Sequence, residues 1–237
     1  MRAFLVDVQR RGLSDQYQHN LARALRRWFN FCITDELAKK LPAVTMPKLE
    51  KHDPFVLTDE QIKTIIDACV YRRDRLICLF LLDSGVRGSE LCALNVGDVD
   101  LKTGAVRVVQ GKGQKDRTTF IGVTLRRELN RYLAGRNAVG TEPLFVSQKR
   151  AGARITLSGV VQLMKRLRKL TGIEELSAHT WRRTFVTRCL LNKMNIYTLA
   201  QMAGHADIGM IRRYLKLVES DLQGAHQQAG VVDHMKL

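Results

Sequence analysis

Six side chains along this chain could together cleave a phosphodiester: Arg87, Lys112, His179, Arg182, His205 and Tyr214. In the transition state of that reaction, phosphorus binds five oxygens and gains negative charge, which guanidinium groups can neutralise through bidentate hydrogen bonds. A tyrosine hydroxyl can be the nucleophile, while lysine and histidine can transfer protons. This inventory needs no metal ion. We therefore expect neither a metal site nor a cofactor.

The chain as a whole is strongly basic. Among its 237 residues are 39 Lys and Arg against 23 Asp and Glu, which gives a net charge of +16. Such an excess favours a polyanionic partner, nucleic acid ahead of a membrane surface, although solvated basic faces are the plain alternative. The longest apolar run, 76–82, is too short to cross a bilayer. Five cysteines without a C-x-x-C pair fit a reducing compartment, so we expect a cytoplasmic protein.

Three prolines close together divide the chain. Pro42, Pro47 and Pro54 fall within one short polar stretch, in which residues 45–56 read as an extended linker. Before it, residues 1–44 predict a small helical region, with Ser14 as a helix cap. After it, residues 57–237 form the main domain.

The main domain is predicted to be mainly α-helical with a small antiparallel β-sheet. Apolar periodicity and capping signals predict helices from 58 onwards and over 76–84, 89–94 and 157–170. Residues 105–109 and 118–121 are rich in strand-forming side chains and flank the turn-rich segment 110–116, which predicts a hairpin. We interpret Gly204, just before His205, as a close backbone approach at a helix start.

Local context separates the six residues from ordinary surface groups. Arg87 lies where one helix ends and another begins, although by itself it could be a surface ion pair with Glu90. Lys112 lies between two glycines at the hairpin tip, where a lone lysine is usually only solvated. His179 and Arg182 are three residues apart, so on a helix they share one face. Tyr214 is flanked by arginines, which argues against the buried phenol that a single tyrosine usually is.

These segments resemble the four conserved boxes of the tyrosine recombinase (phage integrase) family. The resemblance covers about 57–233, and its boxes are 85–91, 111–117, 179–185 and 204–208, the last followed by Arg213 and Tyr214. Trp181 and Arg183 stand where the family commonly has Leu and His. The resemblance implies the tyrosine recombinase catalytic-domain fold, with residues 1–44 as part of a helical core-binding region for DNA.

The resemblance also implies a reaction. Tyr214 would attack a DNA phosphate, giving a 3′-phosphotyrosyl link and a free 5′-hydroxyl, without metal or ATP. Arg87 and Arg182 would stabilise the phosphorane, and Lys112 would protonate the leaving 5′-oxygen. The function implied is site-specific recombination or integration of DNA, as in mobile genetic elements. The alternatives are a type IB topoisomerase-like enzyme that relaxes DNA and a truncated DNA-binding relic.

Other residues receive supporting roles from the same resemblance. His179 would take part in proton transfer, His205 would donate a hydrogen bond to the phosphate, and Glu90 would support the site. Basic side chains expected to contact DNA are Lys115, Arg117, Lys149, Arg150, Arg154, Lys165, Arg183 and Arg212.

The expected partner is double-stranded DNA, bound by a homotetramer on two duplexes. Free protein is expected to be monomeric, and accessory DNA-bending proteins are a further expectation. The segment from about 218 would be exchanged between protomers. We expect no membrane partner and a place at the nucleoid of a prokaryote, phage or mobile element.

Overall fold

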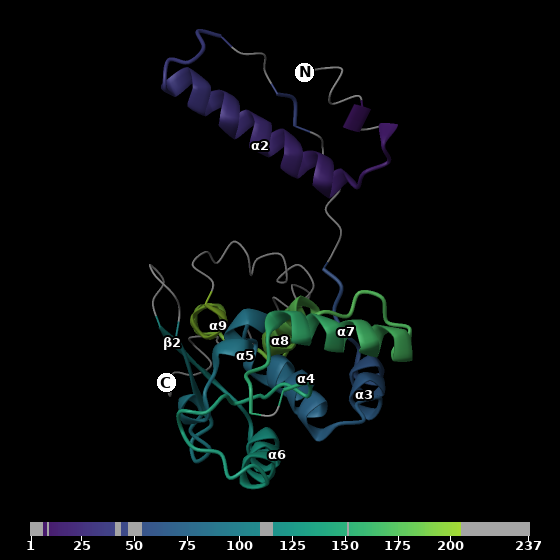
Figure 1. Ribbon diagram of the computed structural model, residues 1–237, viewed down its shortest axis with the longest axis vertical. Coiled ribbons are helices and arrows are strands. Elements are labelled where there is room, and N and C mark those ends of the chain that lie inside the picture. The colour runs from purple at the N-terminus through teal and green to yellow at the C-terminus, as the bar shows by residue number, and fades with distance from the viewer. Residues whose placement is uncertain are drawn as a thin grey trace, which may run out of the picture. The chain divides into compact units, whose positions relative to one another are not determined.

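The computed structural model of the protein describes residues 7–8, 10–40, 44–46, 54–109, 116–150 and 152–204. The chain divides into two compact units, Met1–Asp53 and Pro54–Leu237. In the described residues, the first unit holds one long helix, and the second holds the other named helices and the sheet (Figure 1).

The long helix of the first unit is α2, Asp15–Thr34. Its cap is the predicted one, because the Ser14 side chain accepts a hydrogen bond from the backbone N–H of Tyr17 at 3.3 Å. Ala22 and Cys32 are its buried residues, whereas Trp28 is 59% exposed. The described part of this unit therefore leaves a large aromatic side chain open to solvent.

The second unit begins with α3 (Asp59–Asp67) and α4 (Arg72–Ser84). Thr58 and Gln61 form the predicted capping box at the start of α3, with hydrogen bonds of 3.0 and 3.2 Å between each backbone N–H and the other side chain. The helix α4 begins before the predicted position 76 and ends at Gly85, whose φ of 64° is left-handed. It is the central helix, packed against both α6 (Val123–Ala134) and α8 (Ala178–Leu191).

A short helix, α5 (Gly88–Ala93), and a 3-10 turn, η1 (Val96–Asp98), lead into the sheet. Strand β1 (Ala105–Val108) pairs antiparallel with β2 (Arg117–Phe120), which confirms the strands of the predicted hairpin. Side chains alternate along β2, so that Thr119 is fully buried and Phe120 is exposed. Arg117 lies on the same inward side as Thr119, and its side chain is only 7% exposed.

The remaining helices complete the core. Phe80 of α4 meets Phe145 edge-on, with ring centroids 5.7 Å apart, and α7 (Leu157–Thr171) adds Leu163 and Leu167 to the same core. A second apolar cluster joins α8 to α9 (Ile196–Ala203) through Phe185, Leu190 and Leu199, among others. The helix α9, the last one within the described residues, also contacts β2, and the two lie side by side in Figure 1. Its C-terminal end is therefore held between α8 and the sheet.

This architecture confirms the predicted fold class, mainly α with a small antiparallel sheet. The helix start that the sequence predicts at His205 lies outside the described residues. Gly204 ends α9 as its left-handed C-cap, and its φ is 64°. None of the helices in the described parts of the chain has the length and apolar character needed to cross a membrane.

Candidate active site

Arg87 is held in place by hydrogen bonds to Glu90, and its side chain is partly exposed to solvent. It is the residue that precedes α5, and its backbone N–H donates to Glu90 Oε2 at 2.7 Å. Its Nη1 donates to the other carboxylate oxygen, Glu90 Oε1, also at 2.7 Å. Because the side chain remains 40% exposed, its guanidinium is both oriented and accessible to a ligand.

Arg182 is held far more tightly. It lies on α8 and is 3% exposed, so its charge requires partners within the protein. Nη1 donates to the Gly85 carbonyl oxygen at 2.6 Å, and Nη2 donates to the carbonyl oxygen of Ala203. These two carbonyls lie at the C-terminal ends of α4 and α9, where the helix dipole favours a cation.

Three arginines converge on the end of α9. Successive carbonyl oxygens of Met202, Ala203 and Gly204 accept hydrogen bonds from Arg117, Arg182 and Arg87 respectively. The Arg117 Nε bond is 2.9 Å and the Arg87 Nη2 bond is 3.1 Å. Sites that are distant in sequence therefore meet at the backbone immediately before His205.

Glu90 links two of these arginines. Arg117 donates from Nη1 to Oε1 at 2.8 Å and from Nη2 to Oε2 at 2.7 Å, which is a bidentate pair. Burial raises the pKa of the Glu90 carboxyl, but hydrogen bonds from Arg117 and from the backbone and side chain of Arg87 outweigh burial and lower the pKa to about 2. The carboxylate is thus ionised throughout the neutral range.

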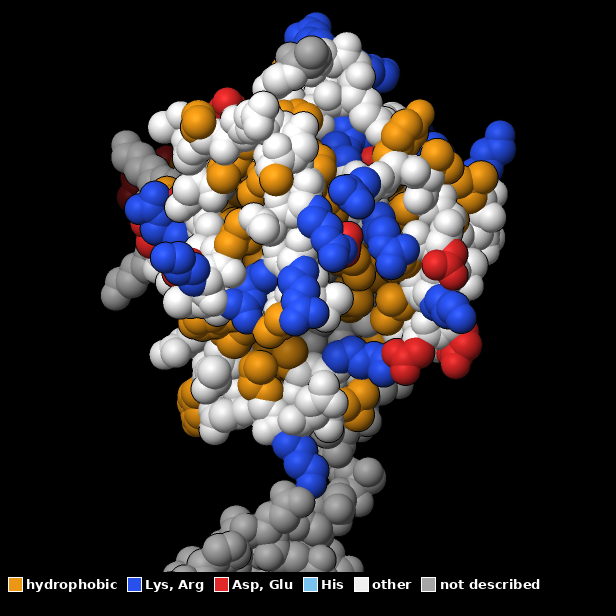
Figure 2. Space-filling model, turned by 90° about the horizontal axis from the view of Figure 1, so that it is seen from below, with side chains coloured by type: hydrophobic (Ala, Val, Ile, Leu, Met, Phe, Trp, Pro, Cys, Tyr) orange, Lys and Arg blue, Asp and Glu red, His pale blue; other side chains and the backbone are white. Residues whose placement is uncertain are grey.

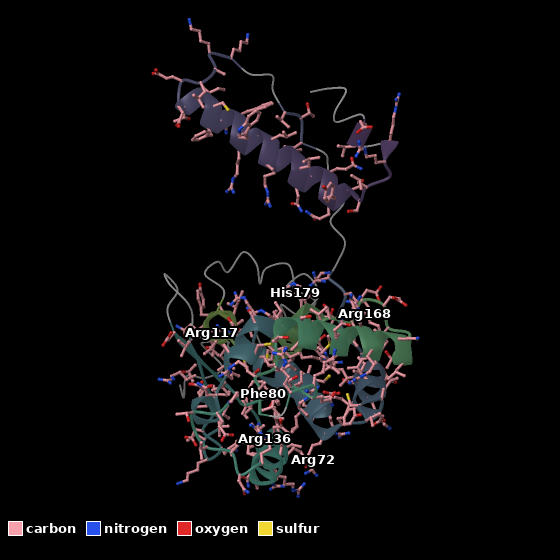
Figure 3. The ribbon with its side chains drawn as sticks, viewed as in Figure 1. Arg72, Phe80, Arg117, Arg136, Arg168 and His179 are labelled. Carbon is pink, nitrogen blue, oxygen red and sulfur yellow. The ribbon has the colours of Figure 1, made fainter. Side chains whose placement is uncertain are left out.

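His179 lies in the first turn of α8, after the cap residue Ser177. Its pKa is lowered by burial and then by the positive charges of Arg183, Arg182 and Arg87. At pH 7 the imidazole is therefore mostly neutral and able to accept a proton. The residue is exposed at the surface, and the influence of these charges on its pKa indicates that it lies near Arg87 and Arg182. Figure 3 shows His179 and Arg117 on one side of the second unit, with Arg72 and Arg136 on the other.

Several predicted site residues lie outside the described residues. These are Lys112, Lys115, His205, Arg212 and Tyr214. The chain on either side of the hairpin tip is described, as is the chain up to Gly204. The site therefore includes the described residues Arg87, Glu90, His179 and Arg182, and it borders the two segments that carry the others.

Two of the residues expected to contact DNA, Arg117 and Arg154, form hydrogen bonds within the protein. Each Arg117 guanidinium nitrogen donates to an acceptor within the protein, as given above. Arg154 Nη1 donates to the carbonyl oxygens of Cys92, Ala93 and Leu94, at 2.9, 2.8 and 2.8 Å, and so caps the end of α5. Both guanidiniums are engaged in hydrogen bonds within the protein, and their contact with DNA stays a prediction. The sequence contained one signal that the Arg117 side chain points inward. Side chains two residues apart in a strand lie on the same face, so Arg117 shares the inward side of β2 with Thr119.

The other expected contacts remain candidates. Lys149, Arg150 and Lys165 are exposed, and Arg183 is partly buried beside His179. Figure 2 shows that Lys and Arg side chains also gather in the middle of the face that is turned downward in Figure 1, with few acidic side chains among them. The positive charge is therefore not confined to the side of the site.

Comparison with known proteins identifies the family. The model of the phage integrase family matches residues 56–220. Over 98% of this chain and 82% of its own length, the tyrosine recombinase XerA of Thermococcus kodakarensis is 31% identical. The corresponding protein of Pyrococcus horikoshii is 32% identical over 97% of this chain and 79% of its own length.

Solved structures agree with these relatives. The crystal structure of a XerA recombinase matches with a TM-score of 0.63 and 31% identity, covering 75% of this chain and 66% of that chain. A post-cleavage complex of the XerH site-specific recombinase with a palindromic difH substrate matches the fold with a TM-score of 0.73 at 22% identity, over 98% of this chain and 71% of that chain. The chain belongs to the phage integrase family, and it is a site-specific recombinase of the tyrosine type. These findings favour recombination over the topoisomerase-like and relic alternatives.

Proposed function

We propose that Arg87, His179 and Arg182 act with Lys112, His205 and Tyr214 as one site that cleaves and rejoins DNA. The observation that carries this proposal is the convergence of Arg87 and Arg182 on the end of α9, directly before the segment with His205 and Tyr214. Two oriented guanidiniums beside a neutral imidazole suit a reaction in which negative charge develops on a phosphate.

In the proposed reaction, the Tyr214 oxygen forms a bond to phosphorus while the bond from phosphorus to the 5′-oxygen breaks. His179 assists transfer of the phenolic proton, and Lys112 supplies a proton to the leaving 5′-oxygen. Arg87 and Arg182 stabilise the charge on the non-bridging oxygens, and His205 donates a hydrogen bond to one of them. The phosphotyrosyl bond keeps the energy of the bond it replaces, so a 5′-hydroxyl can reverse the step.

Substrate and assembly follow from the same proposal. Double-stranded DNA would be bound by residues 1–44, as part of a core-binding region, and by the catalytic domain 57–237, with residues 45–56 as the linker. Four protomers would act on two duplexes and exchange the segment from about 218, while free protein would be monomeric. DNA-bending proteins would assist, and the enzyme would act at the nucleoid. Several solved relatives are complexes with DNA, which supports DNA as the partner.

A cleavage assay tests the site. Sequencing the junctions of covalent adducts formed on a DNA library defines the target, from which a nicked suicide substrate is made. We expect wild type to accumulate adduct and Arg182→Lys to do so about 100-fold more slowly, because lysine cannot replace a bidentate guanidinium.

The matched control is Arg131→Lys, because Arg131 is 64% exposed and pairs with Glu128 on the outer face of α6. This control should react at the wild-type rate. Failure of wild type to form any adduct, or an unchanged rate in Arg182→Lys, would contradict the proposal.

A further inference from the structure

Arg117 differs from the other arginines of the site in what it touches. Its side chain is 7% exposed, and all three guanidinium nitrogens donate to protein acceptors: two to the Glu90 carboxylate and one to the Met202 carbonyl oxygen. A guanidinium this enclosed is in a poor position to meet a DNA phosphate. Its hydrogen bonds instead clamp together separate parts of the protein.

The parts joined by Arg117 come from three distant stretches of sequence. Arg117 itself is the first residue of β2, directly after the hairpin segment that contains Lys112. Glu90 belongs to α5 and orients Arg87, while Met202 belongs to the last turn of α9. One side chain therefore ties the hairpin, the support of Arg87 and the end of α9 together.

Gly204 shows how closely this clamp fits. A Cβ atom on Gly204 would lie 2.8 Å from Cδ and Nε of Arg117 and 2.9 Å from its Cζ, which is closer than side-chain carbons normally approach. The guanidinium thus packs against the backbone that leads into His205. Removing it would leave the Met202 carbonyl without this donor and the Glu90 carboxylate without two of its hydrogen bonds.

We propose that Arg117 is a positioning residue for DNA cleavage, which holds the end of α9 in register with Arg87 and Arg182 by pairing with Glu90. This inference rests on the proposed function of the site. Arg117 influences the relative positions of the reacting groups. A displacement of such groups by about 1 Å can lower the reaction rate about 100-fold. Arg117 acts on the rate of cleavage and not on the affinity for DNA.

The test compares Arg117→Ala with Arg107→Ala. Arg107 is a suitable control because it lies on the partner strand β1, is 68% exposed, and pairs with Asp98 at 3.0 Å. Single-turnover adduct formation on a suicide DNA substrate gives a rate constant and an amplitude, and fluorescence anisotropy gives DNA affinity at several salt concentrations. A merely structural role would lower the amplitude, because fewer molecules are folded, but it would leave the rate constant of the folded fraction unchanged.

We expect the rate constant of Arg117→Ala to fall about 100-fold, with DNA affinity within about threefold of wild type and an unchanged salt slope. Arg107→Ala should keep the wild-type rate constant. A rate constant within threefold of wild type in Arg117→Ala would overturn the inference. The inference would also be overturned if the slope of log affinity against log salt concentration fell in magnitude by about one, because this change indicates the loss of one phosphate contact.

A second variant covers the case in which Arg117→Ala does not fold. Arg117→Lys keeps the positive charge but cannot reach both Glu90 and Met202 as the planar guanidinium does. We expect its rate constant to fall about tenfold, and the wild-type rate constant in this variant would overturn the inference. Absence of adduct in wild type itself would refute the proposed function instead, so the two failures are distinguishable.

Discussion

The charge of Glu90 is expected to make a measurable and pH-dependent contribution to folding. Its pKa is lowered from the ordinary 4.5 to about 2 in the folded protein, since the donors from Arg117 and Arg87 outweigh the cost of burial. A fall of that size corresponds to about 3 kcal/mol of stability. Because the folded pKa lies below the unfolded one, this stability is present above about pH 4.5 and is lost as the pH falls towards 2.

Glu90→Gln removes the charge and keeps the shape. We expect it to lower the free energy of unfolding by about 3 kcal/mol at pH 7 and by about 2 kcal/mol at pH 3.5, where part of the wild-type advantage has already been lost. The comparison between the two proteins cancels the titration of the other carboxyl groups. The gap between them should therefore narrow by about 1 kcal/mol over this range.

Urea unfolding followed by tryptophan fluorescence measures this gap. The chain has two tryptophans, Trp28 and Trp181, so a Trp28→Phe background leaves the fully buried Trp181 as the reporter of the second unit. The control is Glu128→Gln, which breaks an exposed pair with Arg131 and should cost less than about 1 kcal/mol. An equal gap between Glu90→Gln and wild type at both pH values would refute the reasoning.

Three further predictions concern the end of α9, the charge of the protein and its C-terminal segment. Gly204→Ala should slow adduct formation at least tenfold in a single-turnover assay, because alanine is strained at a φ of 64° and its Cβ would collide with Arg117; a wild-type rate would contradict the close packing. DNA affinity measured by anisotropy should fall steeply with salt, by about 0.9 in log–log slope for each phosphate contacted, and a flat dependence would exclude a phosphate-dominated interface. Deletion of residues 224–237 should spare binding to a single DNA site but impair recombination between two sites, and full recombination by the truncated protein would show that this segment is dispensable.

Local signals in the sequence predicted much of the fold. Thr58 and Gln61 specify a helix start, Gly85 specifies a helix end, and the strand-forming residues that flank 110–116 specify two strands. Each of these signals depends only on neighbours within a few residues. The start of α4 was missed for the opposite reason. Its first turn contains the fully buried Asp74, whose charge is paired with Arg73 beside it and with Arg166 of α7. From the sequence alone, the charged first turn of α4 looks solvent-exposed, because the pairing of Asp74 with the distant Arg166 is not visible there.

The sequence could indicate which residues are candidates for the site, but not how these residues are arranged in space. Residue types and spacing indicated Arg87, His179 and Arg182, whereas the hydrogen bonds of Arg87 and Arg182 to the end of α9 join residues that no periodicity relates. Arg117 was predicted to contact DNA because a basic residue beside a hairpin tip is usually exposed. Only the packing of β2 against α9 shows that its guanidinium is enclosed.

The most direct test of the central claim is to identify the residue that becomes joined to DNA. Wild type and Tyr214→Phe are incubated in excess EDTA with a nicked suicide substrate, and the nucleotide-bearing peptide is located by mass spectrometry. The account predicts an adduct in wild type on the peptide that contains Tyr214, formed without metal, and none in Tyr214→Phe, which should still bind DNA. An adduct of undiminished yield in Tyr214→Phe, or cleavage that is lost in EDTA and restored by Mg²⁺, would contradict it.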